Sequence, residues 1–344
     1  MMKWLKIVGG VVVVIGFVVG AGIVSFQNAV NGLERPPLAD CKATSDAACD
    51  GTFKGASGVI EYRLLKPENN SVPQAMLVML HGSGISGPTQ EWLSNGRLQD
   101  LATNEKILVL LPSAGGEYNG WQDEENPNHP IAQKMQDQLP ALLKLIDTMA
   151  SDYNFDRRNV ALSGYSNGGT MSMRMACEAE TPFIAVGTYG SPTTTVQINK
   201  GCAHPTPVLL NHGAKDGTNK FEGGYASFLW REVREYEGYP LEPVLSAAQT
   251  VDFWRNTNGC TDEAKTTMLP DGDPHDGTLT QLISYTNCTS DMPVLQAVVE
   301  NGSHTIPGAR PFPFVVDLVM SGKHSMDYSG HDVFWSFAKD FLHQ

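Results

Sequence analysis

Residues 164–168 read Gly-Tyr-Ser-Asn-Gly, a G-x-S-x-G pattern that can present a serine as a nucleophile. The pattern follows an expected strand, Asn159–Ser163, and precedes a helical stretch, Thr170–Cys177. A sharp strand-to-helix turn would expose the hydroxyl of Ser166 above a helix N-terminus, whose partial positive charge favours developing anions. Because such patterns also occur as ordinary glycine-rich turns, the assignment of Ser166 as nucleophile depends on finding its partners.

A serine hydroxyl is a poor nucleophile unless a positioned base takes its proton, and the expected chain order is serine, acid, histidine. Asp216 follows the apolar run Val208–Leu210, and we expect it to hold the imidazole in one tautomer. A turn aspartate before glycine is the alternative interpretation of Asp216. His304 follows the last apolar run, Val294–Val299, and is the expected base.

Other acids and histidines are weaker candidates. Three competing acids belong to a polar loop that no predicted strand precedes: Asp271, Asp273 and Asp276. His81 and His212 end buried runs, where a histidine more often packs or forms structural hydrogen bonds. The remaining histidines fall in polar segments or in or near the C-terminal helix: His129, His204, His275, His324, His331 and His343.

Attack on a carbonyl creates an oxyanion, which needs preorganised donors. The backbone N–H of Asn167, directly after the candidate nucleophile, is one expected donor. The loop His81-Gly82-Ser83-Gly84 should supply the other, with Ser83 preferred and Gly82 second. A merely tight turn is the alternative.

These candidates must be positioned by a sheet. Continuous apolar runs alternate with helical patterns, which predicts an α/β protein with a doubly wound, mostly parallel sheet and helices on both faces. The expected strands are Val59–Leu65, Ala75–Leu80, Ile107–Leu111, Val160–Leu162, Ile184–Val186, Val208–Leu210 and Val294–Val299. A helix is expected behind Pro140, from the spacing of Leu142, Leu145, Ile146 and Met149. Ligands bind beyond the carboxyl ends of such strands, where the candidates lie.

The first 26 residues differ from the rest. Lys3 and Lys6 precede an uncharged apolar run of 20 residues, Ile7–Phe26. This pattern is typical of a signal peptide, with a weak cleavage site after Ala21, or of an uncleaved membrane anchor through residues 7–26. Both alternatives place the rest of the chain outside the cytoplasm, secreted or anchored. Residues 27–40, with a Pro-Pro pair, are expected to be a linker.

Six cysteines fit an exported protein, because disulfides persist outside the cytoplasm. Fifteen complete pairings are possible, and sequence does not choose among them. Order along the chain suggests Cys41 with Cys49, Cys177 with Cys202, and Cys260 with Cys288. The usual zinc patterns are absent, so we expect no metal and no organic cofactor.

The formal charge of −13 comes from 37 acidic and 24 basic residues, without a basic cluster. Nucleic acid is therefore not an expected partner. The hydrophobic fraction of 41% is enough for a large core, which excludes a disordered chain.

With these residues placed, the chain resembles the secreted esterases grouped with polyhydroxybutyrate depolymerases and bacterial feruloyl esterases, within the α/β-hydrolase superfamily. The resemblance covers about Gly58 to Leu342 and rests on HGSG at 81–84, GYSNGGTMSMRMACE at 164–178, HGAKD at 212–216, WRNTNGC at 254–260 and SHTIPG at 303–308. It implies a triad of Ser166, Asp216 and His304, one catalytic domain over residues 41–344, and disulfides like Cys260–Cys288 and Cys177–Cys202.

Two departures concern the substrate site. Ile306 stands where the family often has tryptophan, and Phe221–Leu241 is a long polar and aromatic stretch that forms either a lid or a surface insertion. Trp121 is a candidate contact for an acyl chain or ring, or else it packs its own loop. Depolymerases of this kind usually carry an additional binding domain, so we expect small-molecule or oligomeric ester substrates: short acyl or aryl esters, or 3-hydroxybutyrate oligomers.

The expected activity is two-step ester hydrolysis. A peptidase of the same fold and a non-catalytic surface binding protein are the alternatives. A peptidase of this fold usually carries a propeller or cap domain, and the segment before Ala75 is too short for a propeller. A non-catalytic binding protein usually lacks a triad member, whereas all three candidates are present here.

Overall fold

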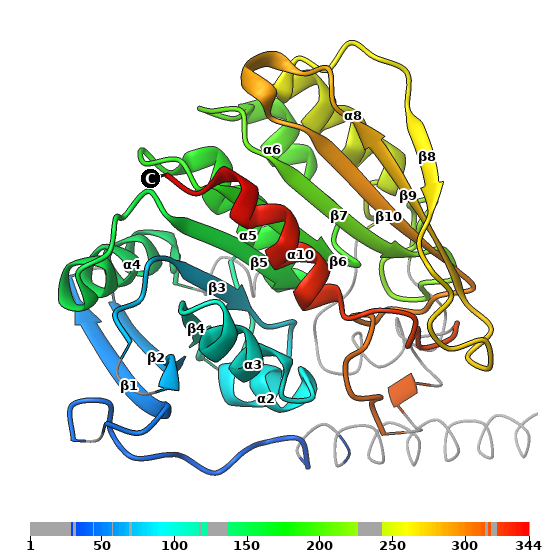
Figure 1. Cartoon of the computed structure of the whole chain (residues 1–344). Coiled ribbons are helices and arrows are strands. Elements are labelled where there is room, and N and C mark those ends of the chain that lie inside the picture. The colour runs from blue at the N-terminus through cyan, green and yellow to red at the C-terminus, as the bar shows by residue number, and fades with distance from the viewer. Residues whose placement is uncertain are drawn as a thin grey trace, which may run out of the picture.

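One ten-stranded sheet runs through the protein, with strand order β1-β2-β4-β3-β5-β6-β7-β10-β9-β8 (Figure 1). The computed structural model describes residues 29, 32–43, 45–56, 58–68, 71–116, 119–122, 136–225, 243–313, 316–317 and 322–343. The strands are β1 (Ala48–Gly55), β2 (Gly58–Leu65), β3 (Met76–Leu80), β4 (Leu108–Ser113), β5 (Val160–Tyr165), β6 (Ala185–Tyr189), β7 (Val208–Gly213), β8 (Lys265–Met268), β9 (Leu279–Tyr285) and β10 (Val294–Glu300).

The centre of the sheet is parallel and its edges are antiparallel. Parallel pairing joins β4, β3, β5, β6, β7 and β10 in that spatial order. Every residue of β3 and β5 is buried, as expected for strands covered on both faces. β1 and β2 extend one edge and β9 and β8 the other, all in antiparallel pairing. The predicted α/β fold with a mostly parallel sheet is confirmed.

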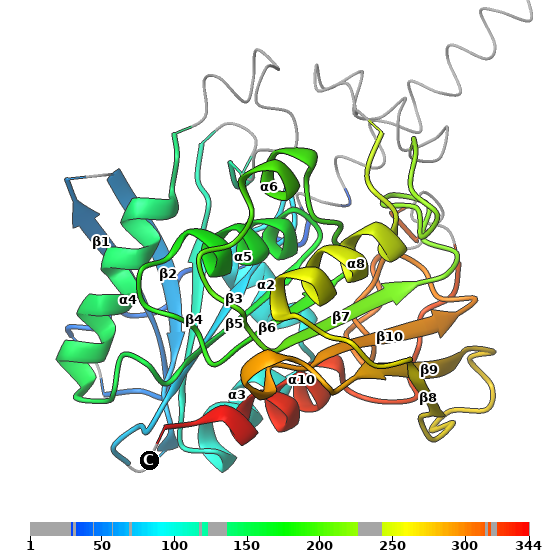
Figure 2. The ribbon, with the colours of Figure 1, turned by 90° about the horizontal axis from the view of Figure 1, so that it is seen from above.

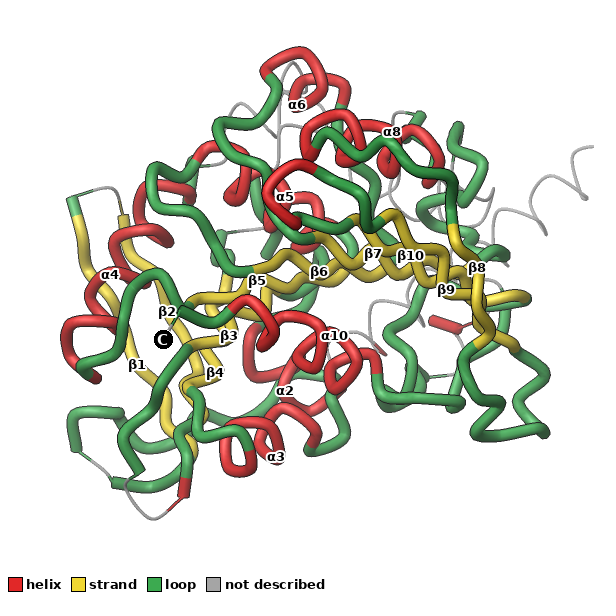
Figure 3. Tube along the Cα trace, turned by 45° about the horizontal axis from the view of Figure 1, so that its top comes forward, coloured by secondary structure: helices red, strands yellow, loops and turns green. Residues whose placement is uncertain are grey.

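Helices cover both faces of the sheet (Figure 3). One face carries α4 (Leu139–Tyr153), α5 (Asn167–Glu178), α6 (Thr195–Lys200) and α8 (Ala247–Asn258), and the other carries α2 (Gly87–Leu93), α3 (Arg97–Asn104) and α10 (Gly330–Ala338). Two single-turn 3₁₀ helices, η3 (Thr289–Asp291) and η4 (Lys339–Phe341), are also present. Two hydrophobic clusters follow this division, one under α4, α5 and α8 and one under α2, α3 and α10. Seen from above, α5 and α8 lie across the middle strands (Figure 2).

The helix predicted behind Pro140 is α4. Its buried face includes the residues that the helical spacing indicated: Leu142, Leu145, Ile146 and Met149. Pro140 sits in the first turn, where its missing N–H has no intrahelical partner to lose. Asn154 ends the helix in the left-handed conformation, with φ of 55°.

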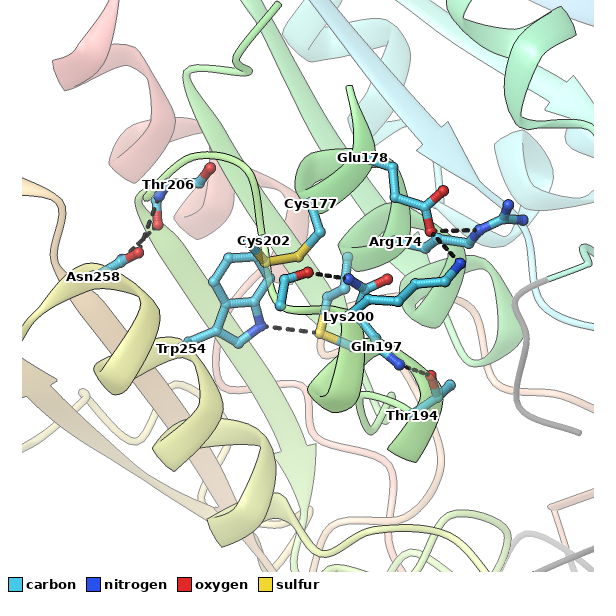
Figure 4. The surroundings of a disulfide bond; sticks show 12 residues. Arg174, Cys177, Glu178, Thr194, Gln197, Lys200, Cys202, Thr206, Trp254 and Asn258 are labelled. Atoms are coloured by element: carbon cyan, nitrogen blue, oxygen red, sulfur yellow. Dashed lines mark hydrogen bonds and ion pairs between the residues drawn. A yellow bond between two sulfur atoms is a disulfide. The ribbon is translucent and has the colours of Figure 1, made fainter. Parts of the chain in front are cut away.

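All six cysteines are paired: Cys41–Cys49, Cys177–Cys202 and Cys260–Cys288. The pairing suggested by order along the chain is therefore confirmed. Figure 4 shows Cys177–Cys202, which joins the last turn of α5 to the segment after α6, beside the buried Trp254 of α8. Three disulfides are typical of an extracellular protein.

The segment predicted as a linker, residues 27–40, packs against the domain over residues 32–40. Leu33 is buried, and its carbonyl accepts a hydrogen bond of 3.0 Å from Thr89 Oγ1. Arg63 donates to the carbonyl of Pro36 and forms ion pairs with Asp50 and Glu91. The segment 1–26 lies outside the described residues. Among the helices that are described, none is both long and apolar enough to cross a membrane.

Candidate active site

The turn between β5 and α5 holds Ser166 in a strained conformation. Its φ of 53° and ψ of −128° belong to a region that residues other than glycine rarely adopt, at a cost of roughly 1–3 kcal/mol. Glycines at 164 and 168 make the turn possible, because a Cβ on Gly164 would clash with the Gly168 backbone and one on Gly168 with the His81 carbonyl. The N–H of Ser166 donates to the carbonyl of Tyr189 at 2.9 Å. Ser166 is partly exposed.

Asp216 and His304 form a buried pair. His304 Nδ1 lies 2.6 Å from Asp216 Oδ2, and the two residues, His304 and Asp216, are 2% and 4% exposed. The other carboxylate oxygen, Oδ1, accepts the N–H groups of Thr218 and Asn219, each at 2.8 Å. Burial alone would raise the pKa of Asp216, but His304 and His212 outweigh it and hold that pKa below its ordinary value. Asp216 is therefore ionised at neutral pH and fixes the imidazole through Nδ1.

The serine turn and the histidine loop meet at Tyr165 and Gly190. The Tyr165 hydroxyl donates to the His304 carbonyl at 2.7 Å, and the two rings have centroids 5.0 Å apart. Burial raises the pKa of Tyr165 well above its ordinary value, so this hydroxyl keeps its proton. A Cβ on Gly190 would lie 2.7 Å from His304 Nδ1 and 3.0 Å from Asp216 Oδ2. Tyr165, next to the nucleophile, and Gly190, at the end of the neighbouring strand, thus both adjoin the buried pair.

The loop after β3 adjoins the serine. A Cβ on Gly82 would lie 3.3 Å from the Cβ of Ser166, so the loop backbone passes close to the nucleophile. Within the described part of the chain, the N–H groups of Gly82 and Ser83 donate to no protein acceptor. Asn167 directly follows Ser166, and its side-chain amide exchanges two hydrogen bonds with the backbone of Trp121, at 2.6 and 3.0 Å.

Trp121 is 1% exposed, and its indole N–H donates to the His81 carbonyl at 2.9 Å. This burial agrees with the alternative interpretation, in which the Trp121 ring packs its loop, and the substrate contact at Trp121 stays a prediction.

Comparison with known proteins agrees with this geometry. A family described as "Putative esterase" matches residues 59–337 of the 344-residue chain. The chain belongs to this esterase family. It is a carboxylic ester hydrolase of the α/β-hydrolase type, as the sequence predicted.

Individual relatives are distant. The esterase is 25% identical to "Putative esterase NocK" of Nocardia uniformis subsp. tsuyamanensis, over 82% of this chain and 79% of that protein. It is also 25% identical to feruloyl esterase B of Neurospora crassa, over 59% of this chain and 75% of that protein. Its fold is similar to that of an acetyl xylan esterase from Aspergillus awamori, with a TM-score of 0.53 and 13% identity over 85% of this chain and 99% of that one.

The competing acids of the esterase lie apart from the buried pair. A short exposed strand, β8, does precede their loop, contrary to the prediction, but it is the edge strand of the sheet. Asp276 accepts the N–H groups of Thr278 and Met326 and so holds two loops together. Ile306, at the position where the family often has tryptophan, is buried and lines a small cavity with Tyr165 and Phe312. Of the stretch 221–241, residues 226–241 lie outside the described residues.

Sequence reasoning missed Gly190, Asn219 and Tyr165 as supporting residues of the esterase site. The backbone N–H of Asn219 donates to Asp216, and its side-chain amide donates a second hydrogen bond, of 2.8 Å, to the Gly190 carbonyl. Gly190 directly follows the buried strand β6, which is the signal that could have found it. Tyr165 occupies the variable position of the G-x-S-x-G pattern, so the motif itself gave no signal.

Proposed function

We propose that this esterase acts through Ser166 as nucleophile, His304 as general base and acid, and Asp216 as the partner that orients the imidazole. The observation that carries the proposal is the buried 2.6 Å pair of His304 and Asp216 beside the strained serine turn. A carboxylate on Nδ1 keeps the proton there, which leaves Nε2 with its lone pair. That tautomer is the one that can remove a proton from a serine hydroxyl.

The first half of the reaction forms an acyl-enzyme. His304 Nε2 takes the proton of Ser166 Oγ as the oxygen attacks the ester carbonyl, and negative charge moves to the carbonyl oxygen. The N–H groups of Asn167 and Ser83 are the proposed donors to that oxyanion. As the tetrahedral intermediate collapses, the alcohol leaves with the proton from His304.

The second half repeats the chemistry with water. His304 removes a proton from water, which attacks the acyl carbon, and the same donors stabilise the second oxyanion. Ser166 then leaves with its proton and the carboxylic acid is released. Every proton thus passes through one imidazole, whose charged form is stabilised by Asp216.

We propose that the substrates are short acyl or aryl esters or 3-hydroxybutyrate oligomers. The name of the Neurospora crassa relative, feruloyl esterase B, supports aryl esters. The partly exposed Ser166 supports access by small or oligomeric esters. We also propose that the esterase is exported, with residues 7–26 as signal or anchor, because three disulfides and an apolar run behind Lys3 and Lys6 agree with that route.

Ser166→Ala tests the mechanism. The variant should lose covalent labelling by a fluorophosphonate probe and nearly all hydrolysis of p-nitrophenyl esters, with unchanged folding by circular dichroism. Ser151→Ala, on an exposed position of α4, is the control that should keep both. Labelling or full hydrolysis by Ser166→Ala would refute the assignment.

A panel of p-nitrophenyl esters, methyl ferulate and 3-hydroxybutyrate oligomers tests the substrate class. The proposal expects kcat/KM to be highest for one of these groups. It fails if none is hydrolysed by wild-type protein that the probe does label.

A further inference from the structure

Two buried aromatic side chains hold the loop that adjoins Ser166. The carbonyl of His81 accepts the indole N–H of Trp121 at 2.9 Å, and the carbonyl of Gly82 lies 2.7 Å from His81 Nδ1. We propose that His81 and Trp121 are positioning residues that aim the N–H groups of this loop at the substrate oxyanion. This inference rests on the proposed serine mechanism and adds to it how the oxyanion hole is preorganised.

The hydrogen bonds of His81 fix its tautomer. A carbonyl can only accept, so the bond to Gly82 requires the proton on Nδ1. The N–H of Ala114 can only donate, and it lies 3.0 Å from Nε2, which must therefore carry a lone pair. Burial lowers the pKa of His81 to about 4, so the ring stays neutral in this tautomer at working pH. His81 is thus a fixed donor toward the loop.

The bond to the Gly82 carbonyl sets the direction of the next N–H. In a trans peptide, the carbonyl and the N–H of one plane point in opposite directions. Because His81 holds the Gly82 carbonyl from one side, the Ser83 N–H of the same plane faces the other way. The peptide between His81 and Gly82 is held in the same manner, by the indole of Trp121. Both candidate donors of the loop, Gly82 and Ser83, are therefore oriented through their carbonyls.

Trp121 also ties the loop to the nucleophile turn. Its backbone N–H and carbonyl pair with the side-chain amide of Asn167, the residue after Ser166. The rings of Trp121 and His81 are in contact, with centroids 4.9 Å apart. The contacts of His81 and Trp121, here called the frame, thus connect the two proposed sources of oxyanion donors, the loop after β3 and the nucleophile turn.

Such a frame should act on the transition state more than on substrate binding. The charge on the carbonyl oxygen develops only during attack, so donors that are misaimed weaken the transition state and leave the ester itself nearly as well bound. Displacing a catalytic contact by about 1 Å can cost around 100-fold in rate. Loss of the hydrogen bond to either the His81 or the Gly82 carbonyl should therefore lower kcat by roughly 10- to 100-fold, with KM changed by less than about threefold.

Trp121→Phe is the first test, because it keeps an aromatic ring and removes the indole N–H. We expect the loss in kcat given above and a matching loss of affinity for an arylboronic acid, which forms a tetrahedral anion on the serine. Trp254→Phe is the matched control: Trp254 is also fully buried, and its indole N–H donates to Met173 Sδ where α8 packs on α5. The control should keep wild-type kcat and boronate affinity.

His81 is tested by comparing His81→Asn with His81→Leu. The asparagine amide can replace Nδ1–H as donor to the Gly82 carbonyl, so His81→Asn should recover at least several-fold of the kcat that His81→Leu loses. Equal kcat in the two variants at equal thermal stability would overturn the role of that bond. Wild-type kcat and boronate affinity in folded Trp121→Phe would overturn the role of the indole.

These outcomes are distinguishable from failure of the serine mechanism itself. If Ser166→Ala kept its activity, the proposed serine mechanism would be wrong, whatever the variants at Trp121 and His81 show. If Ser166→Ala is inactive while Trp121→Phe and both His81 variants remain fully active, the serine mechanism stands and the frame is wrong.

Discussion

His304 Nδ1 and Asp216 Oδ2 lie 2.6 Å apart in a site where both side chains are almost completely buried. The carboxylate also accepts two backbone N–H groups and faces His212 Nε2 at 3.4 Å. The N–H of His212 Nε2 donates to the Asn219 carbonyl at 2.6 Å, so His212 braces the loop that carries the acid. Asp216 is held by several groups at once, and its role can be isolated by changing one atom.

Asp216→Asn should lower kcat by roughly 10⁴-fold. The amide can donate to His304 Nδ1, which would move the imidazole proton to Nε2 and leave no lone pair toward Ser166. The measurement is kcat on a p-nitrophenyl ester together with the rate of fluorophosphonate labelling. Asp271→Asn, at an exposed position in the competing acidic loop, is the control and should behave as wild type. Asp216→Asn with more than a tenth of wild-type kcat would exclude Asp216 as the acid.

Gly190→Ala should inactivate the enzyme without unfolding it. Gly190 has φ of 61°, and its added Cβ would lie 2.7 Å from His304 Nδ1, so the imidazole must move. We expect kcat to fall roughly 100-fold. Gly96→Ala is a matched control, because Gly96 also has positive φ, at 85° in the left-handed region, but no atom lies within 4 Å of the place that its Cβ would occupy.

Both glycine variants should lose about 1 kcal/mol of unfolding free energy to backbone strain, measured by urea denaturation. Only Gly190→Ala should lose kcat. If the two variants had equal kcat, contact with the His304 imidazole would not explain why residue 190 is a glycine.

The catalytic candidates were predictable because β3, β5 and β7 are buried on both faces and start with apolar runs, and because β10, although partly exposed, is still mostly apolar. β3, β5, β7 and β10 were all expected within a few residues of their bounds. Since parallel strands end at one edge, the residues after those runs had to gather there. The positions of Ser166, Asp216 and His304 follow from this rule.

The edges of the sheet gave no such signal. β8 is exposed along its whole length and β1 is mostly part-buried, so neither contains an apolar run. The environment of Trp121 was also beyond local reasoning. Its burial depends on bonds to His81 and Asn167, which are 40 and 46 residues away in sequence, and only the folded chain reveals such contacts.

Removing the disulfide Cys260–Cys288 should lower stability without changing the chemistry. The bond closes a separation of 28 residues between the end of α8 and the segment after β9. The loop-entropy relation predicts a loss of about 3–4 kcal/mol on replacing both cysteines with serine. The measurement is the free energy of unfolding in urea, with kcat recorded below the transition.

The disulfide Cys41–Cys49 provides the comparison, since it closes a separation of only 8 residues. Its double serine variant should lose about 1 kcal/mol less than the Cys260–Cys288 variant. A larger loss for the shorter loop would show that native contacts, rather than the entropy of the unfolded chain, dominate the stabilisation.

The esterase should lose stability between pH 6.5 and pH 4 because it buries neutral histidines. Burial lowers the pKa of both His81 and His331 from 6.5 to about 4. The unfolded chain accepts protons below pH 6.5 while the folded state resists them, so unfolding becomes easier as the pH falls toward 4. Each histidine contributes about 3 kcal/mol of this loss, and above pH 6.5 the stabilisation is complete.

His331→Leu isolates one of these contributions. His331 lies in α10, 2% exposed, with its ring against that of Tyr189. The variant can no longer bind a proton at this position in either state, so its unfolding free energy should decline about half as steeply over this pH range. Urea denaturation at half-unit steps of pH measures both slopes. Equal slopes for wild type and His331→Leu would show that protonation of His331 is not linked to unfolding.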